Sequence, residues 1–139
     1  MENAIKISEA ASIAMHAMSL LAADPGARFT AGEIAGRLDV SEAHLSKVLQ
    51  RLARQGFVDA VRGPGGGFML GKKGRKATLM AVLEAIEGPF KARDCLMKRR
   101  ICRGRECIFG SLLEKMNGEF REYLAGTTIA DLGKSFETA

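Results

Sequence analysis

The chain has 139 residues, of which 47% are apolar, enough for one domain with a modest core. Its 21 Lys and Arg against 16 Asp and Glu give a formal charge of +5. The longest apolar run, residues 10–23, is too short to span a bilayer, and Glu2 and Glu9 flank it where a signal peptide needs cations. We therefore expect a cytoplasmic protein with no membrane partner.

The positive charge is confined to two patches. Residues 41–76 carry a net charge of +6 and residues 91–107 one of +5, so the rest of the chain is acidic, with a net charge of −6. A basic patch indicates contacts to nucleic-acid phosphates and binding that weakens with salt. The second patch surrounds three cysteines and needs a different explanation.

A first helix is predicted over residues 8–23, which are rich in Ala, Met and Leu and end at Asp24-Pro25-Gly26. Its polar side chains recur at steps of three or four and therefore share one face; they are Glu9, Ser12, His16 and Ser19. That face is either a helix edge at the surface or part of a site.

A pair of helices follows. Thr30 stands three residues before Glu33, the spacing of a capping box, and starts the first helix of the pair. Residues 39–40 make the turn, and Ser41 caps the second helix. The apolar face of that second helix consists of Leu45, Val48, Leu49 and Leu52. Its polar side chains point largely the other way and include Ser46, Lys47, Gln50, Arg51 and Arg54.

A β-hairpin with a glycine-rich tip comes next. Gly56 ends the helix, and strands are predicted over residues 57–62 and 68–70. The four glycines and one proline between them leave Arg62 beside a tip that could approach a nucleic-acid groove closely. Taken alone, the hairpin is equally consistent with an exposed arginine of no function. Together with the two helices it predicts a winged helix-turn-helix.

The second half of the chain is predicted to contain two further helices and a loop. Residues 72–76 read as a solvated turn, Thr78 caps a short helix ended by Gly88-Pro89, and residues 91–107 lack periodicity. A long helix over residues 106–125 carries a broad apolar stripe of Phe109, Leu112, Leu113, Met116, Phe120, Tyr123 and Leu124. Thr128, three residues before Asp131, starts a last helical turn.

The long helix has more apolar surface than a small winged domain covers. A two-fold pair of such helices would bury it, so a homodimer is expected, with packing inside one chain as the alternative. The fold class is thus mainly α with a small β-wing. Residues 1–76 form a winged helix-turn-helix DNA-binding region, and residues 77–139 form the cysteine loop and dimerisation helix of the same integrated domain.

Three cysteines, Cys95, Cys102 and Cys107, lie within one basic segment of that loop. In a cytosolic protein such cysteines are metal ligands or reactive thiols more often than disulfide partners. Thiolates are the ligands of iron–sulfur clusters, and the surrounding bases would offset the negative charge of a cluster. Reactive thiols without a cluster are the second interpretation. A structural zinc site is the third and weakest, because no C-x-x-C pair is present.

One stretch keeps an enzyme hypothesis open. Residues 66–73 nearly match the phosphate-binding motif G-x-x-x-x-G-K-[ST]. Lys73 replaces the Ser or Thr that would bind Mg²⁺, and residues 68–70 are apolar where a loop should wrap phosphate. A nucleotide-binding enzyme is therefore a remote alternative.

Several segments together resemble one known family. They are residues 41–52, 56–58, 61–70, 82–88 and 128–132, with the three cysteines between them. The chain is similar to the Rrf-two family of bacterial winged-helix regulators. The resemblance implies a homodimeric transcription factor, a repressor, that binds a near-palindromic double-stranded DNA operator with the second helix in the major groove and Arg62 in the minor groove. The DNA contacts it implies are Ser41, His44, Ser46, Lys47, Gln50, Arg51, Arg54, Arg62, Gly63 and Gly65.

The resemblance also implies control of operator binding by a 2Fe–2S or 4Fe–4S cluster that senses redox, iron–sulfur or nitric oxide status. The cluster would be held by Cys95, Cys102, Cys107 and His16 from the first helix of the partner subunit, unless His16 only forms a hydrogen bond at the dimer seam. The chain departs from iron–sulfur members of the family at Ser46, where they carry a base-reading glutamate. Its cysteine spacing differs too, and Gly110 replaces a histidine ligand. A cluster-free, thiol-based redox or metabolite sensor of the same fold is the alternative.

Overall fold

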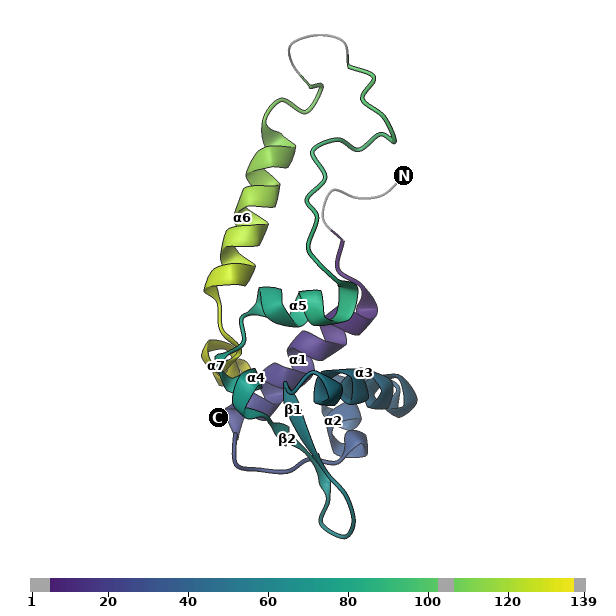
Figure 1. Ribbon diagram of the computed structural model, residues 1–139, viewed down its shortest axis with the longest axis vertical. Coiled ribbons are helices and arrows are strands. Elements are labelled where there is room, and N and C mark those ends of the chain that lie inside the picture. Colours follow the sequence, from purple (N-terminus) through teal and green to yellow (C-terminus); the bar gives the residue numbers. More distant parts are fainter. Residues whose placement is uncertain (1–5, 103–106, 137–139) are drawn as a thin grey trace.

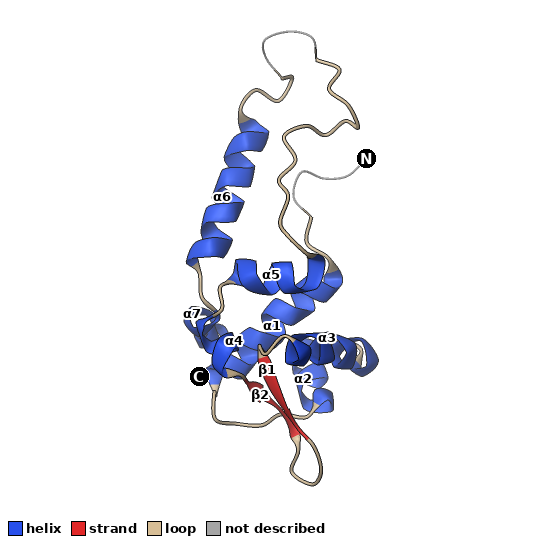
Figure 2. Cartoon of the chain, in the orientation of Figure 1, coloured by secondary structure: helices blue, strands red, loops and turns tan. Residues whose placement is uncertain are grey.

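The computed structural model describes residues 6–102 and 107–136. In chain order the elements of these residues are α1 (Glu9–Ala23), α2 (Ala31–Leu38), α3 (Glu42–Arg54), β1 (Val58–Val61), β2 (Gly67–Leu70), α4 (Lys72–Lys76), α5 (Leu79–Glu87), α6 (Leu112–Gly126), α7 (Ile129–Leu132) and the 3₁₀ turn η1 (Gly133–Phe136). The predicted fold class, mainly α with a small antiparallel β-hairpin, is confirmed (Figures 1 and 2). No helix among the described residues is long and apolar enough to cross a membrane.

The helices begin where short polar side chains can accept a free backbone N–H. The side chains of Thr30, Ser41, Thr78 and Thr128 each accept from the third residue after them, as predicted. At Thr128 the capping box is complete, since Asp131 accepts the Thr128 N–H in return. Hydrogen bonding from Thr128 lowers the pKa of Asp131 below its ordinary value.

Helix α1 lies at the centre of a single hydrophobic core. Ala14, Met18 and Leu21 have no exposed surface, and α1 packs against α3, α5 and α7. Side chains from both expected regions, residues 1–76 and residues 77–139, contribute to this core. Among them are Leu45, Leu49, Leu52, Val82, Leu83 and Ile129. Ser19, expected on a polar face, is itself buried and donates its hydroxyl to the Met15 carbonyl oxygen at 2.7 Å. The predicted polar face of α1 is therefore broken at its C-terminal end.

The wing is a two-stranded hairpin with a third segment added. Strands β1 and β2 pair antiparallel, from Val58 opposite Leu70 to Val61 opposite Gly67. Phe29, in the connection before α2, forms a bridge with Phe68 through hydrogen bonds of 2.9 and 2.7 Å. Gly67 permits this contact, because a Cβ there would lie 2.7 Å from the Phe29 carbonyl oxygen. The sequence analysis did not predict this third segment.

The turn expected at residues 72–76 is wrong, although all of these residues except Gly74 are exposed to solvent, as expected. These residues form α4, in which Gly74 is buried. It packs against the backbone of Phe57, since a Cβ added to Gly74 would lie 2.1 Å from the Phe57 carbonyl oxygen. Lys73 donates to the Gln55 carbonyl oxygen at 3.2 Å, and its ammonium lies 4.6 Å from the centroid of the Phe57 ring. Helix α4 thus packs against the C-terminal end of α3. This tertiary packing overrides the weak helix propensity of residues 72–76.

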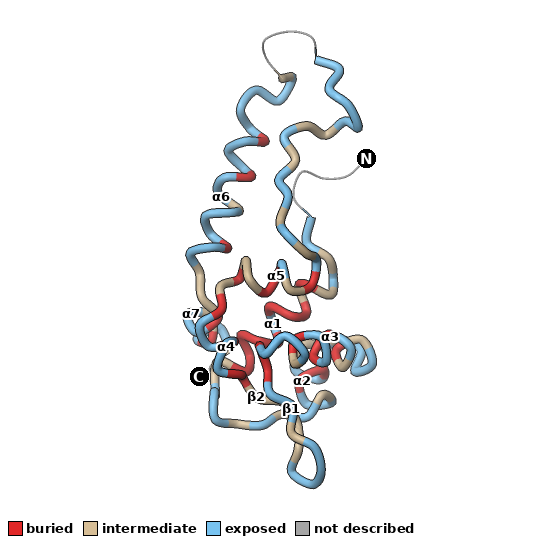
Figure 3. The backbone as a smooth tube through the Cα atoms, viewed as in Figure 1, coloured by how far each residue is buried: buried red, intermediate tan, exposed pale blue. Residues whose placement is uncertain are grey.

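Helix α6 begins at Leu112 instead of residue 106: residues 107–111 are not helical, and residue 106 lies outside the described residues. Of its stripe, Leu113 and Leu124 are buried and Phe120 is half-buried. The other side chains are 41–60% exposed: Phe109, just before the helix, and Leu112, Met116 and Tyr123. Figure 3 shows most of α6 exposed, so packing within this chain leaves an apolar surface uncovered.

Candidate nucleic-acid interface and cysteine loop

A groove of about 760 Å³ runs between α3 and the wing. It is lined by Thr30, Ala31, Gln50, Ala53, Arg54, Ala60, Val61, Arg62, Gly63, Gly66, Gly67 and Phe68. Four residues expected to contact DNA thus lie together here, two from α3 and two from the wing: Gln50, Arg54, Arg62 and Gly63. The groove combines an apolar floor with exposed guanidinium groups.

The exposed face of α3 is the one that continues this groove. At 100° per residue, Lys47, Gln50 and Arg54 fall together opposite the buried leucines, and all three are exposed. Ser46 is half-buried at the edge of this face, and Ser41 is exposed at the start of the helix, where its hydroxyl accepts the His44 N–H at 3.3 Å. A polyanion could reach these residues without any rearrangement of the core.

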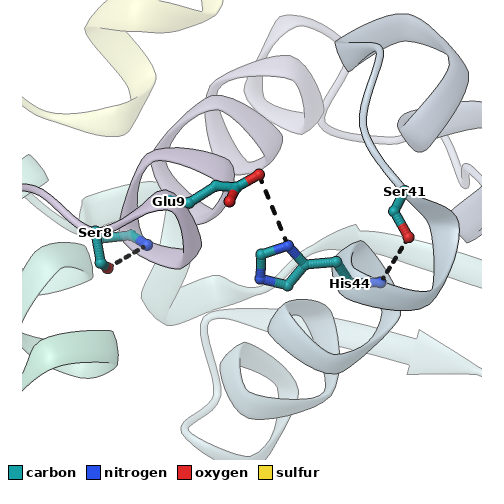
Figure 4. A network of polar contacts seen from close by, with 5 residues as sticks. Ser8, Glu9, Ser41 and His44 are labelled. Atoms are coloured by element: carbon teal, nitrogen blue, oxygen red, sulfur yellow. Dashed lines mark hydrogen bonds and ion pairs between the residues drawn. The ribbon is translucent and has the colours of Figure 1, made fainter.

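Two expected contacts, His44 and Arg51, lie instead on the flank of α3 that meets α1 and α5. Nδ1 of His44 is 4.0 Å from Oε1 of Glu9 on α1 (Figure 4). Arg51 donates through Nη2 to the Ile86 carbonyl oxygen at 2.6 Å, and the next residue on that flank, Gln55, donates to the Ala85 carbonyl oxygen at 2.9 Å. Helical spacing alone did not show that neighbouring elements occupy this flank.

The wing tip is bare backbone flanked by arginine. Arg62 is exposed, and Gly63 and Gly65 have φ values of 89° and 73°, which other residues adopt only with strain. Gly66 has no room for a side chain, since a Cβ would lie 2.3 Å from the Val61 carbonyl oxygen. A second arginine stands close by: Nη1 of Arg28 lies 3.5 Å from the Gly65 carbonyl oxygen. Arg28 was not among the residues expected to contact DNA.

The cysteine loop leaves the end of α5 and returns at the start of α6. Cys95 and Cys107 are half-buried and Cys102 is exposed. The Sγ of Cys107 accepts the Phe109 N–H at 3.4 Å, and Asn117 of α6 donates to the Arg93 carbonyl oxygen at 2.7 Å. Arg100 and Asp94 form an ion pair across the loop. In Figure 1 this loop and the wing tip lie at opposite ends of the molecule.

The donor set of this loop fits an iron–sulfur cluster in chemistry but not in its present arrangement. Three thiols are the ligand type that such clusters use. Among the described residues, however, no three His, Cys, Asp or Glu side chains converge on a point where a metal could bind.

His16 is exposed on α1 beside an apolar pocket of about 310 Å³. Its Nδ1 lies 2.6 Å from the Ser12 carbonyl oxygen, and because a carbonyl can only accept, Nδ1 donates this hydrogen bond and Nε2 takes no part in it. Glu9, seven residues earlier on α1, was expected on the same side, and its Oε1 lies 4.0 Å from Nδ1 of His44 on α3.

The stretch that resembles a phosphate-binding motif is a β-strand. Its residues 67–70 form β2, and the N–H and carbonyl of Phe68 are both bonded to Phe29. A backbone whose N–H groups are used in a sheet cannot wrap a phosphate.

Comparison with known proteins identifies the family. The sequence model of the Rrf2 family, described as iron-dependent transcriptional regulators, matches residues 7–135. The chain belongs to the Rrf2 family. It is a helix-turn-helix transcriptional regulator and not an enzyme.

Similar sequences and solved structures support this assignment. An HTH-type regulator of Aquifex aeolicus is 30% identical over 128 residues, covering 90% of this chain and 89% of the relative. IscR of Yersinia pseudotuberculosis is 31% identical over 100 residues, covering 72% of this chain and 61% of IscR. Among solved structures, CymR of B. subtilis matches with a TM-score of 0.76 at 25% identity, covering 94% of this chain and 98% of CymR. IscR of T. potens matches with a TM-score of 0.70 at 28% identity, covering 96% and 89%.

Proposed function

We propose that this Rrf2 protein binds a near-palindromic operator with α3 in the major groove and the wing in the minor groove. The observation that carries the proposal is the groove that joins Gln50 and Arg54 of α3 to Arg62 of the wing. The proposed contacts are Ser41, Ser46, Lys47, Gln50, Arg54, Arg62, Gly63 and Gly65. His44 and Arg51 position α3 instead, because their side chains face α1 and α5.

The proposed binding unit is a homodimer formed through α6. Leu112, Met116 and Tyr123 are 41–60% exposed along one helix, a surface that a second copy of α6 would cover. Two recognition helices related by a two-fold axis could then reach successive major grooves, about 34 Å apart. Near-palindromy of the operator follows from that symmetry.

Operator binding is proposed to be controlled by an iron–sulfur cluster held by Cys95, Cys102 and Cys107. The family description as iron-dependent supports iron as the metal, and three thiols within a basic loop supply suitable donors. His16 of the partner subunit is the proposed fourth ligand, through Nε2. Its Nδ1 bond to the Ser12 carbonyl oxygen is the kind of support that orients a metal-binding histidine.

A connection between the loop and the recognition helix runs through α5. Helix α5 ends at Glu87, Gly88 caps it with a φ of 85°, and the cysteine loop follows directly. Arg51 and Gln55 of α3 donate to two carbonyl oxygens in the last turn of α5, those of Ile86 and Ala85. Closure of the loop would pull on the end of α5 and, through these hydrogen bonds, shift α3 relative to the wing.

A cluster-free thiol sensor is the second candidate. Cys102 is exposed, so an oxidant could reach its thiol. CymR, the global cysteine regulator of B. subtilis, has the same fold. In this version, oxidation of the thiols would move the loop and the same α5 connection would transmit the change.

Anaerobic purification with visible spectroscopy and iron and sulfide analysis separates the two candidates. The cluster proposal predicts visible absorption with iron and acid-labile sulfide in the protein. A colourless, iron-free protein that still changes operator affinity on thiol oxidation would establish the second candidate instead.

A further inference from the structure

The connection between α1 and α2 places a third arginine at the DNA-facing surface. Phe29 is fixed by two backbone hydrogen bonds to Phe68 of β2. The neighbouring residue, Arg28, is thereby held beside the wing, and its Nη1 lies 3.5 Å from the Gly65 carbonyl oxygen at the tip. The backbone next to Arg28 is thus fixed by hydrogen bonds in the same way as a third strand of the wing would be.

The guanidinium of Arg28 is largely uncommitted. The Gly65 contact is long for a hydrogen bond and engages one nitrogen, whereas a guanidinium offers five N–H donors. Among the described residues no carboxylate lies within ion-pair distance of Arg28. The acidic residue of the hairpin, Asp59, is three residues from Arg62 along β1, about 10 Å at the rise of a strand. The tip therefore presents two cations without local neutralisation.

We propose that Arg28 is a second DNA contact of the wing, whose guanidinium binds a backbone phosphate beside the groove that Arg62 enters. This inference rests on the proposed operator binding. A phosphate is the partner because a planar guanidinium pairs bidentately with phosphate oxygens.

A phosphate contact has a distinct signature. It contributes equally to every DNA sequence, and its loss reduces the dependence of log affinity on log salt by about one. Arg62, as a groove contact, should instead affect the operator more than an unrelated sequence. The two wing arginines are therefore separable by measurement.

The test compares Arg28→Ala with Arg37→Ala, which removes the same charge from α2. Arg37 stacks on the Phe29 ring, with its Cζ 5.1 Å from the ring centroid, and it does not line the α3–wing groove. Fluorescence anisotropy is measured over a salt series on the operator and on an unrelated duplex of equal length. Arg28→Ala is expected to weaken both by a similar factor, about 5- to 30-fold at low salt, and to lower the salt slope by about one. Arg37→Ala should leave the slope unchanged.

Duplexes with single neutral methylphosphonates locate the contact. A methylphosphonate at one position near the minor groove should weaken DNA binding by the wild type and leave binding by Arg28→Ala unchanged. Arg28→Lys should bind DNA more tightly than Arg28→Ala and less tightly than the wild type. An unchanged slope in Arg28→Ala, while Arg62→Ala still loses operator affinity, would overturn the Arg28 contact and leave the proposed function standing. Wild-type protein that shows no salt-dependent DNA binding would overturn both.

Discussion

Arg51 of α3 donates a 2.6 Å hydrogen bond to the carbonyl oxygen of Ile86, one residue before the end of α5. The helix C-terminus carries partial negative charge, so a guanidinium there is favourable as well as hydrogen-bonded. Gln55 makes the same kind of bond one residue earlier on α5. The recognition helix is thus attached to the element from which the cysteine loop departs.

Arg51→Ala is expected to lower the free energy of unfolding by about 1–3 kcal/mol, the range for a lost hydrogen bond to a charged group. It should also reduce the difference in operator affinity between the two states of the cysteine loop. Urea unfolding and anisotropy check these outcomes. Lys47→Ala is the control: Lys47 is exposed on the DNA-facing side of α3, so its loss should lower the salt slope without changing stability. Unchanged stability with a lowered salt slope in Arg51→Ala would make Arg51 a phosphate contact instead.

Arg62→Ala is expected to weaken operator binding by about 1–3 kcal/mol, as the loss of one groove contact should. Arg75→Ala provides the matched control, since Arg75 is an exposed arginine on α4, outside the α3–wing groove. Anisotropy on a selected operator measures both variants. Equal losses in the two variants would show that only net charge matters at the wing.

Local signals were sufficient for the helix starts and the winged arrangement. The caps at Thr30, Ser41, Thr78 and Thr128 depend on residues three apart, and the sequence shows that spacing directly. Helix α4 was missed because it is stabilised by the approach of Gly74 to the Phe57 carbonyl oxygen, a contact between segments.

The roles of individual site residues could not be predicted from the sequence, because they also depend on contacts between segments. Helical spacing places Arg51 on the polar side of α3 but does not reveal that α5 ends beside it. Similarly, steps of three and four put Glu9 on the face of His16 but do not reveal that His44 of α3 lies 4.0 Å from its carboxylate. Arg28 had no local signal at all, because its place depends on the bridge between Phe29 and Phe68.

Gly74→Ala is expected to destabilise the protein by about 1–3 kcal/mol, because the new methyl would overlap the Phe57 carbonyl oxygen. Gly36→Ala is the opposite control. Gly36 is exposed in α2, and its added Cβ would meet nothing within 4 Å, so alanine should stabilise the helix by about 0.5–1 kcal/mol. Thermal and urea unfolding measure both. Equal effects of the same sign would contradict the packing described for α4.

His16→Ala is expected to leave the fold and basal DNA binding intact and to alter the spectrum or lifetime of the proposed cluster. Nε2 of His16 is the reason, since it can bind iron while Nδ1 donates to the Ser12 carbonyl oxygen. Glu9→Ala should have much less effect on the cluster, because Glu9 faces His44. Spectra of the reconstituted variants from pH 6 to 8 make the comparison. An unchanged spectrum and stability in His16→Ala would place the fourth ligand elsewhere.

We expect the cysteine loop to set operator affinity. The direct measurement is anisotropy on one operator with anaerobic protein before and after iron removal, for the wild type and for Cys102→Ser. The wild type should change its affinity by about 10-fold or more, within the usual range of allosteric coupling. Cys102→Ser should stay folded and dimeric, lose most of its iron, and keep the affinity of the iron-free protein in both treatments. Wild-type protein with the same affinity in both states, or a Cys102→Ser protein that retains its iron and still switches, would contradict the account.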